Sequence, residues 1–269
     1  MAESGLGQVR VVLVEPAGPL NVGSVARVMK NMGLHQLWLV HPHCDPQSDL
    51  AQQMAVHGSD VLAAATVVET LPQALVGCQR AVATVGRDRT AGEDLELPEV
   101  VLPWLLPGEG NAHAQSALIF GPEDRGLSNA ELAYAQRCLR IPASDVYPSL
   151  NLAQAVAVCC YVLRRQALGV DTELAHCSLP NALMTAKSLP SVDLDQADED
   201  QADLGQIEGF YQQLEALLLE VGYLYPHTAL SRMEKFRRLL HRAAPSKQEL
   251  AMLRGILSQV SWALATKHR

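Results

Sequence analysis

The sequence predicts an α/β domain with a mainly parallel sheet, followed by a small C-terminal helical appendage. Two observations support this fold class. Within residues 1–168, short runs of β-branched and other apolar side chains alternate with segments of helical periodicity, as in a parallel sheet with helical crossovers. After an acidic stretch, the rest of the sequence shows helical periodicity alone. A chain of 269 residues has room for one such domain and a smaller unit.

The expected strands are short apolar runs of the kind that a parallel sheet buries on both faces. The first, Val9–Glu15, has the sequence VRVVLVE and is apolar at most positions. The others, in chain order, are Leu37–Val40, Arg80–Thr84, Ala117–Phe120 and Leu139–Ile141.

The expected helices lie between and after these runs. Val22–Met32 has apolar side chains on one face, and Gly33 follows it as a helix stop. The others are Asp49–Val56, Leu71–Val76 and the long, nearly wholly apolar Leu152–Leu168, which ends at Gly169.

The chain is expected to divide into a domain at residues 1–169, an acidic linker at 170–206 and a helical extension at 207–269. Residues 88–115 hold three prolines and three glycines, so we expect a loop there. The linker contains the acidic run Asp193–Asp203 and has too little apolar surface to fold alone. The helices of the extension are expected at Phe210–Val221, Ser231–Leu240 and Lys247–Leu264, the last preceded by a capping box of Ser246 and Glu249.

The composition is that of a soluble globular protein, with 48% hydrophobic and 19% charged residues. No apolar run approaches the roughly 18 residues of a membrane span, and Met1–Gly7 lacks the features of a secretion signal. The six cysteines show no Cys-x-x-Cys spacing, which favours reduced thiols. We therefore expect a cytoplasmic protein that has no membrane partner.

The net charge of −8 hides a segregation of charge along the chain. Residues 191–231 contain nine acidic side chains and no Lys or Arg, whereas residues 232–269 contain nine basic and two acidic side chains. A basic tail allows a polyanion to bind locally even though the whole chain is acidic. In this tail we expect Arg237, Arg238, Arg242 and Arg254 to contact phosphates.

Three polar segments follow expected strands, at the edge where open α/β sheets bind ligands. The first is Asn21–Arg27, in which Asn21 suits a helix cap and Gly23 allows a close backbone approach. Arg27 is expected within the first two helical turns, near an end that favours anions. Taken alone, the segment fits a simple cap and a solvated charge at least as well.

The second segment, Phe120–Asn129, combines a Gly-Pro turn, Glu123 and Arg125 before a helix that Ser128 can open. Its pattern fits a site and a turn equally well. The third segment, Ile141–Asn151, runs from a strand end into the most apolar helix, and both Ser149 and Asn151 suit a cap for that helix. Their hydroxyl and amide groups could also orient a ligand.

A metal site is not expected. His41, His43 and Cys44 have side chains that suit zinc, but the sequence lacks a second group of ligands at the usual spacing. A surface loop is the favoured interpretation of these residues.

Together the segments resemble the motifs of the SpoU (TrmH-like) ribose methyltransferases over about residues 9–168. The matching positions are Asn21-x-Gly23-x-x-x-Arg27 with Lys30, Asn31 and Gly33, then Phe120-Gly-Pro-Glu-x-x-Gly-Leu127, then Ile141-Pro and Ser149-Leu-Asn151. The tail resembles that of the TrmJ branch, which methylates tRNA, in Phe236-Arg-Arg-Leu-Leu and Leu253-Arg-Gly-Ile-Leu.

The resemblance implies a SPOUT-type parallel sheet with a C-terminal trefoil knot, S-adenosylmethionine as cofactor, no metal, a homodimer, and tRNA as partner. It also implies a function, the methylation of a ribose 2′-hydroxyl in tRNA, with nucleotide 32 of the anticodon loop as the expected target. Two alternatives are a ribosomal RNA methyltransferase with the same motifs and a knotted protein that binds RNA without turnover.

The resemblance further implies roles for individual residues. Arg27 has the position of a catalytic residue from the partner subunit, but an arginine loses its proton only above pH ~12, so stabilisation of charge is the favoured role. The loop that begins at Thr84 reads Thr-Val-Gly-Arg where TrmJ-type sequences tend to have Thr-Ser-Ala-Arg, so side-chain contacts there are expected to differ. The implied catalytic residues are Arg27, Glu123, Ser149 and Asn151; the cofactor-binding residues are Thr84, Val85, Gly86, Gly121, Ile141, Pro148, Ser149 and Leu150; the substrate-binding residues are Asn21, Arg27, Arg87 and Arg125.

Overall fold

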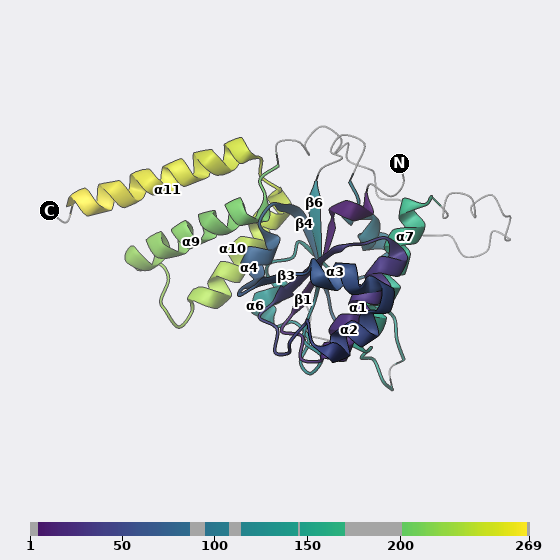
Figure 1. Ribbon diagram of the computed structural model, residues 1–269. Helices are drawn as coiled ribbons and strands as arrows, with labels where there is room; N and C mark the ends of the chain where they lie inside the picture. The colour runs from purple at the N-terminus through teal and green to yellow at the C-terminus, as the bar shows by residue number, and fades with distance from the viewer. Residues whose placement is uncertain (1–4, 87–94, 108–113, 145, 170–200, 268–269) are drawn as a thin grey trace.

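A parallel β-sheet forms the centre of the molecule (Figure 1). The computed structural model describes residues 5–86, 95–107, 114–144, 146–169 and 201–267. In these residues seven strands pair in the order β3-β2-β1-β6-β4-β7-β5, and every pairing is parallel. The strands are β1 (Val9–Val14), β2 (Gln36–Val40), β3 (Thr66–Val68), β4 (Cys78–Thr84), β5 (Leu95–Glu96), β6 (Gln115–Phe120) and β7 (Arg137–Leu139).

The central strands are buried on both faces, which explains their continuous apolar sequences. Along β1, Val11 and Leu13 belong to one hydrophobic cluster, whereas Val12 and Val14 belong to another. Successive side chains of a strand point to opposite faces, so each cluster lies on its own face of the sheet.

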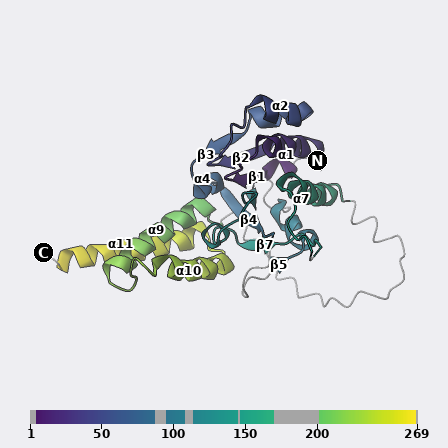
Figure 2. The same ribbon diagram turned by 90° about the horizontal axis from the view of Figure 1, so that it is seen from below.

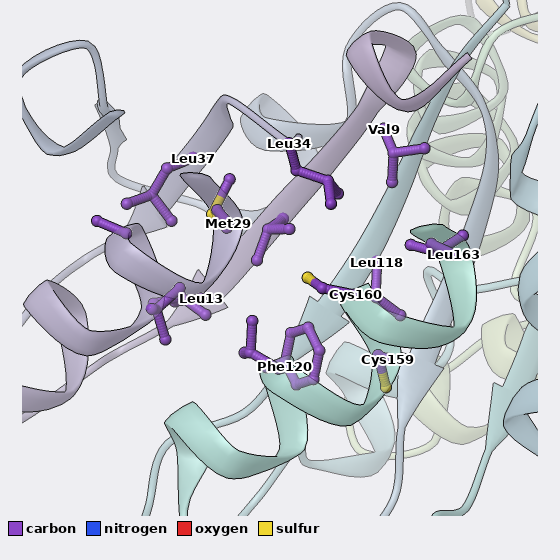
Figure 3. Close-up of a cluster of buried hydrophobic side chains, with 14 of the residues drawn as sticks. Val9, Leu13, Met29, Leu34, Leu37, Leu118, Phe120, Cys159, Cys160 and Leu163 are labelled. Carbon is purple, nitrogen blue, oxygen red and sulfur yellow. The ribbon is translucent and has the colours of Figure 1, made fainter. Parts of the chain in front are cut away.

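One face is covered by helices from the first 169 residues (Figure 2). α1 and α7 pack against each other on this face, and their buried side chains meet those of β1 and β6 (Figure 3). The elements that contribute to this side are η1 (Leu6–Gln8), α1 (Pro19–Met32), α2 (Asp49–Ala55), η2 (Val56–Gly58), α3 (Ser59–Ala63), α5 (Pro98–Val101), η3 (Leu102–Leu105) and α7 (Leu152–Ala167).

The other face is covered mainly by the C-terminal helices, seen in green and yellow in Figure 1. Leu204, Ile207, Phe210, Tyr211 and Met233 are buried in the same cluster as side chains of β4 and β6. α11 extends from this unit along α9. The helices on this side are α4 (Leu71–Leu75), α6 (Asn129–Leu132), α9 (Leu204–Glu220), α10 (Ala229–Ala243) and α11 (Lys247–Lys267).

The helices of the extension pack on the sheet and share its core, and α9 begins within the segment 170–206 that was expected to be a linker. Asp203 caps α9, its side chain accepting a hydrogen bond from the Gln206 amide, so the helix begins at Leu204. Gln201 already pairs with Ser246 in an isolated bridge. Residues 170–200 of the expected linker lie outside the described residues.

Most expected elements are confirmed within a few residues, but α9 begins six residues before the expected Phe210, α3 was not expected, and three further elements differ. α1 begins at Pro19 rather than Val22, because proline fits the first helical position, where no N–H is needed. β7 lies at Arg137–Leu139 rather than Leu139–Ile141, and its arginine is accommodated by an ion pair with Glu96. β3 is too short to give a periodic signal and was not expected.

The prediction of a loop at residues 88–115 is only partly correct. Residues 95–105 form β5, α5 and η3, and Val101, Leu102 and Leu105 are buried in the cluster on the α1 side. Two of the three prolines that suggested a loop, Pro98 and Pro103, stand at the starts of α5 and η3.

In the described parts of the chain, no helix is both long and apolar enough to cross a membrane.

Candidate active site

A cavity of about 350 Å³ opens where β4, β6 and β7 end. The loops after these strands form its walls, and α7 contributes Leu152 and Ala155. All of the residues expected to bind the cofactor line this cavity, namely Thr84, Val85, Gly86, Gly121, Ile141, Pro148, Ser149 and Leu150. Three segments that are far apart in the sequence thus meet at one place.

The loop Gly121–Leu127 folds tightly beside the cavity. A Cβ atom at Gly121 would lie 2.4 Å from the Leu127 nitrogen and 2.5 Å from the Gly126 carbonyl carbon, which no side chain tolerates. The loop then enters α6 through a capping box of Ser128 and Glu131, as the sequence predicts.

Glu123 is held at the end of β1. Its carboxylate accepts hydrogen bonds from the Ala17 amide at 3.1 Å, the Gly18 amide at 3.3 Å and Asn21 Nδ2 at 2.8 Å. Asn21 lies in the first turn of α1 and is not its cap, because Gly18 occupies the cap position. These contacts fix the carboxylate in place, so Glu123 acts as an anchor between the second motif and the first.

Asn151 connects the third motif to the same network. Its Oδ1 accepts hydrogen bonds from the amides of Ala153 and Gln154, so it caps α7 as expected. Its Nδ2 donates to Asn21 Oδ1 at 3.0 Å. Asn21 thus joins Glu123 and Asn151, and the three motifs are linked by side-chain hydrogen bonds.

Arg125 lies in a clamp of two carboxylates rather than in an open position. Its guanidinium donates to Glu131 at 2.9 and 3.0 Å and to Glu15 at 2.7 Å. Burial alone would raise the pKa of Glu131, but hydrogen bonds from Arg125 and Ser128 outweigh it and hold that pKa at about 2. The clamp ties the loop to both β1 and α6, and Arg125 also lines the cavity.

Arg27 stands apart from the cavity. It is the ninth residue of α1, so the expected position within the first two turns is wrong, because the helix begins earlier. The side chain is exposed and does not line the cavity. Within the described ranges it has neither a hydrogen bond nor an ion pair. Arg87, another expected substrate contact, lies outside the described residues.

The helix that carries Arg27 is packed closely on its neighbours. A Cβ atom at Gly23 would lie 2.2 Å from the Ala51 carbonyl oxygen, which confirms the close backbone approach expected there and shows that its partner is α2. The backbone at Arg27 is therefore fixed, although its side chain is exposed.

The remaining expected residues play different parts. The Thr84 hydroxyl donates to the Ile119 carbonyl at 3.0 Å, so it joins β4 to β6. Ser149 is half-buried in the cavity wall, and Asn151 rather than Ser149 caps α7.

Sequence reasoning missed two groups at this edge. Glu15 holds Arg125, and its backbone has φ +47°, which is uncommon for a residue other than glycine. The second group is the apolar lining made by Leu132, Leu139 and Leu152. A leucine beside a motif looks like any core residue, so no sequence signal separated these from the rest.

Among the residues described at this edge, Cys44 is poorly suited to act as a covalent nucleophile. Burial, followed by the charges of Glu123 and Asp45, raises the pKa of Cys44, so its thiol is less readily ionised. Within the described residues, no group of three or more His, Cys, Asp and Glu side chains is placed to hold a metal ion. The cavity and the loops around it are suited to binding two reactants and holding them in position for a direct reaction.

The tail also differs from its expected role at one position. Arg237 pairs with Glu208 at 2.5 and 3.0 Å, and these side chains are only 14% and 13% exposed. Its guanidinium lies 4.4 Å from the ring centroid of Tyr211 and 4.7 Å from that of Tyr134. Arg237 is thus committed to packing and not to a phosphate. Nothing is described for the side chain of Arg242.

Comparisons with known proteins agree with these motifs. The model of the SpoU rRNA Methylase family matches residues 8–161, and that of the tRNA methyltransferase TrmJ C-terminal domain matches residues 205–269. The tRNA (cytidine/uridine-2′-O-)-methyltransferase TrmJ of Pectobacterium atrosepticum is 39% identical over 267 residues, which cover 95% of this chain and 97% of the relative. The tRNA (cytidine/uridine/adenosine-2′-O-)-methyltransferase TrmJ of Pseudomonas aeruginosa is 38% identical, with 94% of each chain covered.

Solved structures give the same result. TrmJ from Z. mobilis has a TM-score of 0.73 and 26% identity, with 94% of this chain and 98% of that chain covered. A probable methylase family protein from Haemophilus influenzae has a TM-score of 0.57 and 29% identity, with 97% and 99% covered.

Proposed function

The chain belongs to the SpoU methylase family, and we propose that it is an S-adenosylmethionine-dependent methyltransferase that modifies a ribose 2′-hydroxyl of tRNA. The observation that carries this proposal is the meeting of the three motif segments around one cavity at the strand ends. The C-terminal match and the names of the full-length relatives support tRNA as the substrate.

The volume of the cavity is suitable for a small-molecule cofactor such as S-adenosylmethionine. This volume lies within the range of roughly 300–1,000 Å³ that is usual for small-ligand sites. A side chain at Gly86 would meet no atom within 4 Å, so a ligand can approach the backbone there. Thr84–Gly86, Gly121, Ile141 and Pro148–Leu150 would hold the cofactor. Bound there, S-adenosylmethionine supplies an electrophilic methyl group on a sulfonium centre.

The residues of the chain then position the ribose. The 2′-hydroxyl must point at the methyl group and lose its proton as it reacts. Glu123, Asn21 and Asn151 hold the three motifs in one arrangement. A guanidinium from Arg27 would bind the neighbouring phosphate and stabilise the negative charge that forms on the ribose oxygen.

Arg27 would come from a partner subunit, because it does not line the cavity of its own chain. A homodimer is therefore part of the proposal. It is supported by exposed apolar side chains beside the cavity and on α7, which a second copy would cover: Val146, Tyr147, Val158 and Tyr161.

A C-terminal trefoil knot is also part of the proposal. It is supported by the course of the chain: β7 lies beyond β4 in the sheet, yet the segment that follows leads to α7, which packs on α1. Cytidine or uridine is the proposed nucleoside, since the relatives are named for these nucleosides. Nucleotide 32 of the anticodon loop is the proposed position, as the resemblance of the sequence to the family implies.

The test combines the purified protein, S-adenosylmethionine and an unmodified tRNA transcript, with mapping of 2′-O-methyl groups. We expect one methyl group at nucleotide 32. A ribosomal RNA fragment in parallel tests the alternative substrate. Methylation of that fragment alone would replace tRNA by ribosomal RNA, and cofactor binding without transfer to either RNA would favour a binding protein.

A further inference from the structure

The turn between α9 and α10 carries an exposed group of aromatic side chains, which we call the aromatic tip: Tyr223, Tyr225 and His227. Tyr223 and Tyr225 are 53% and 55% exposed, and His227 is also exposed. A turn between two helices does not require such side chains. In Figure 1 the tip lies at the outer end of the green helices, away from the sheet.

The aromatic tip is held in a defined arrangement. The rings of Tyr225 and His227 are stacked, with centroids 5.9 Å apart and an angle of 23° between planes. Arg232 lies 5.4 Å from the ring centroid of Tyr223 and donates to the Tyr223 carbonyl at 3.2 Å. The aromatic rings are thus exposed to solvent in fixed positions, so they would lose little conformational entropy when a ligand binds.

A basic stripe begins at the tip and follows α10. Arg232, Lys235 and Arg238 are all exposed and are spaced three residues apart, so they share one side of the helix. Arg237 lies on a different side of α10, where it pairs with Glu208. The helix therefore separates an arginine used for packing from basic side chains that face solvent.

α10 packs on the turn after α6, where Arg237 contacts Tyr134. Arg232, Lys235 and Arg238 remain exposed on the same helix. A polyanion lying along α10 would thus extend from the tip along the exposed side of the helix.

We propose that the aromatic tip and the basic stripe form an RNA-binding surface, in which the rings stack on unpaired bases and the basic side chains contact phosphates. This inference rests on tRNA being the substrate. It adds where on the protein the tRNA binds and which interactions hold it. Aromatic rings next to cationic side chains suit single-stranded nucleic acid. The rings can stack on the flat faces of the bases, and the cations can pair with the negatively charged phosphates. A second copy of the chain is the poorer fit, since two such basic surfaces would repel each other.

The test compares binding of an unmodified tRNA transcript by the full-length protein and its variants over a range of salt concentrations. Tyr225→Ala is expected to weaken binding roughly 5- to 100-fold without changing the dependence on salt, because a lost stack involves no ion. Tyr225→Phe should bind like the wild type. Arg232→Met should lower the slope of log affinity against log salt by about one phosphate contact.

Trp262→Ala is the matched control, since Trp262 is equally exposed on α11 but lies outside the tip. It should keep wild-type affinity, and every variant should keep wild-type affinity for S-adenosylmethionine in calorimetry. Irradiation of a tRNA transcript that contains 4-thiouridine should cross-link peptide 221–228.

Unchanged tRNA affinity in Tyr225→Ala overturns the proposal, as does an equal loss in Trp262→Ala. A change of sedimentation in Tyr225→Ala would also overturn it, because the tip would then contact another copy. A wild type that binds tRNA without methylating it contradicts the proposed function instead, and the binding comparison still decides the role of the tip.

Discussion

The two faces of the sheet are covered by different parts of the chain and use their charged side chains differently. On one face, α1 and α7 cover the sheet, and the arginine that α1 carries, Arg27, is exposed. On the other face, α9 and α10 cover the sheet, and Arg237 is largely covered and paired with Glu208. A count of basic residues therefore does not show which of them can bind RNA, because an arginine is exposed on one face and packed against other side chains on the other.

The largest effect is expected on the α1 face. Arg27→Ala should lower turnover by about 100- to 1,000-fold or more, because the charge that forms on the ribose oxygen loses its stabilisation. Its affinity for S-adenosylmethionine should stay the same, since Arg27 does not line the cavity. Methyl transfer to tRNA and calorimetry measure the two effects, and Arg27→Lys shows how much of the role is charge alone. Wild-type turnover in Arg27→Ala would refute the role.

The second effect tests the other face. Arg237→Met should destabilise the protein by about 3–5 kcal/mol, because it leaves the Glu208 carboxylate buried without a partner. Urea unfolding measures the change. The double variant Arg237→Met, Glu208→Gln should recover part of the loss, and Arg232→Met, at an exposed position, should cost less than about 0.5 kcal/mol. Equal losses in Arg232→Met and Arg237→Met would remove the contrast between packed and exposed arginines.

The third effect is a dependence of the protein's stability on pH, which arises from a histidine on the C-terminal face. Burial, with the charge of Arg237 added, lowers the pKa of His241 to about 4. Below a pH of about 6.5 the unfolded chain binds a proton that the folded protein does not, so stability should fall by about 1.4 kcal/mol per pH unit down to about pH 4. The difference in unfolding free energy between wild type and His241→Asn, followed over this range, measures it. A difference that is constant with pH would contradict the lowered pKa.

The smallest effect concerns the clamp at the cavity edge. Arg125→Gln should weaken cofactor binding by several-fold, because the loop that it ties to Glu15 and Glu131 becomes looser. The pKa of Glu131 lies at about 2, below its usual value, so the stabilisation is present above about pH 4.5 and is lost as the pH falls toward 2. Glu131→Gln should remove this acid-range loss. An unchanged cofactor affinity in Arg125→Gln would show that the clamp does not support the site.

Much of the α/β order and of the site could be predicted from the sequence, because both depend on local patterns. Buried strands such as β1 and β6 are apolar along their length, and the cap at Asn151 depends on residues next to it in the chain. The resemblance to the family motifs likewise named the eight residues expected to bind the cofactor, and all of them line the cavity.

What the sequence could not determine depends on contacts between distant residues. The partners of Arg125 lie six residues away at Glu131 and 110 residues away at Glu15, and Arg237 meets Glu208 and Tyr134 only because α9 and α10 pack on the sheet. An exposed arginine and a buried one have the same helical spacing in the sequence. The tertiary structure alone decided between them, because burial and ion pairing depend on which elements meet.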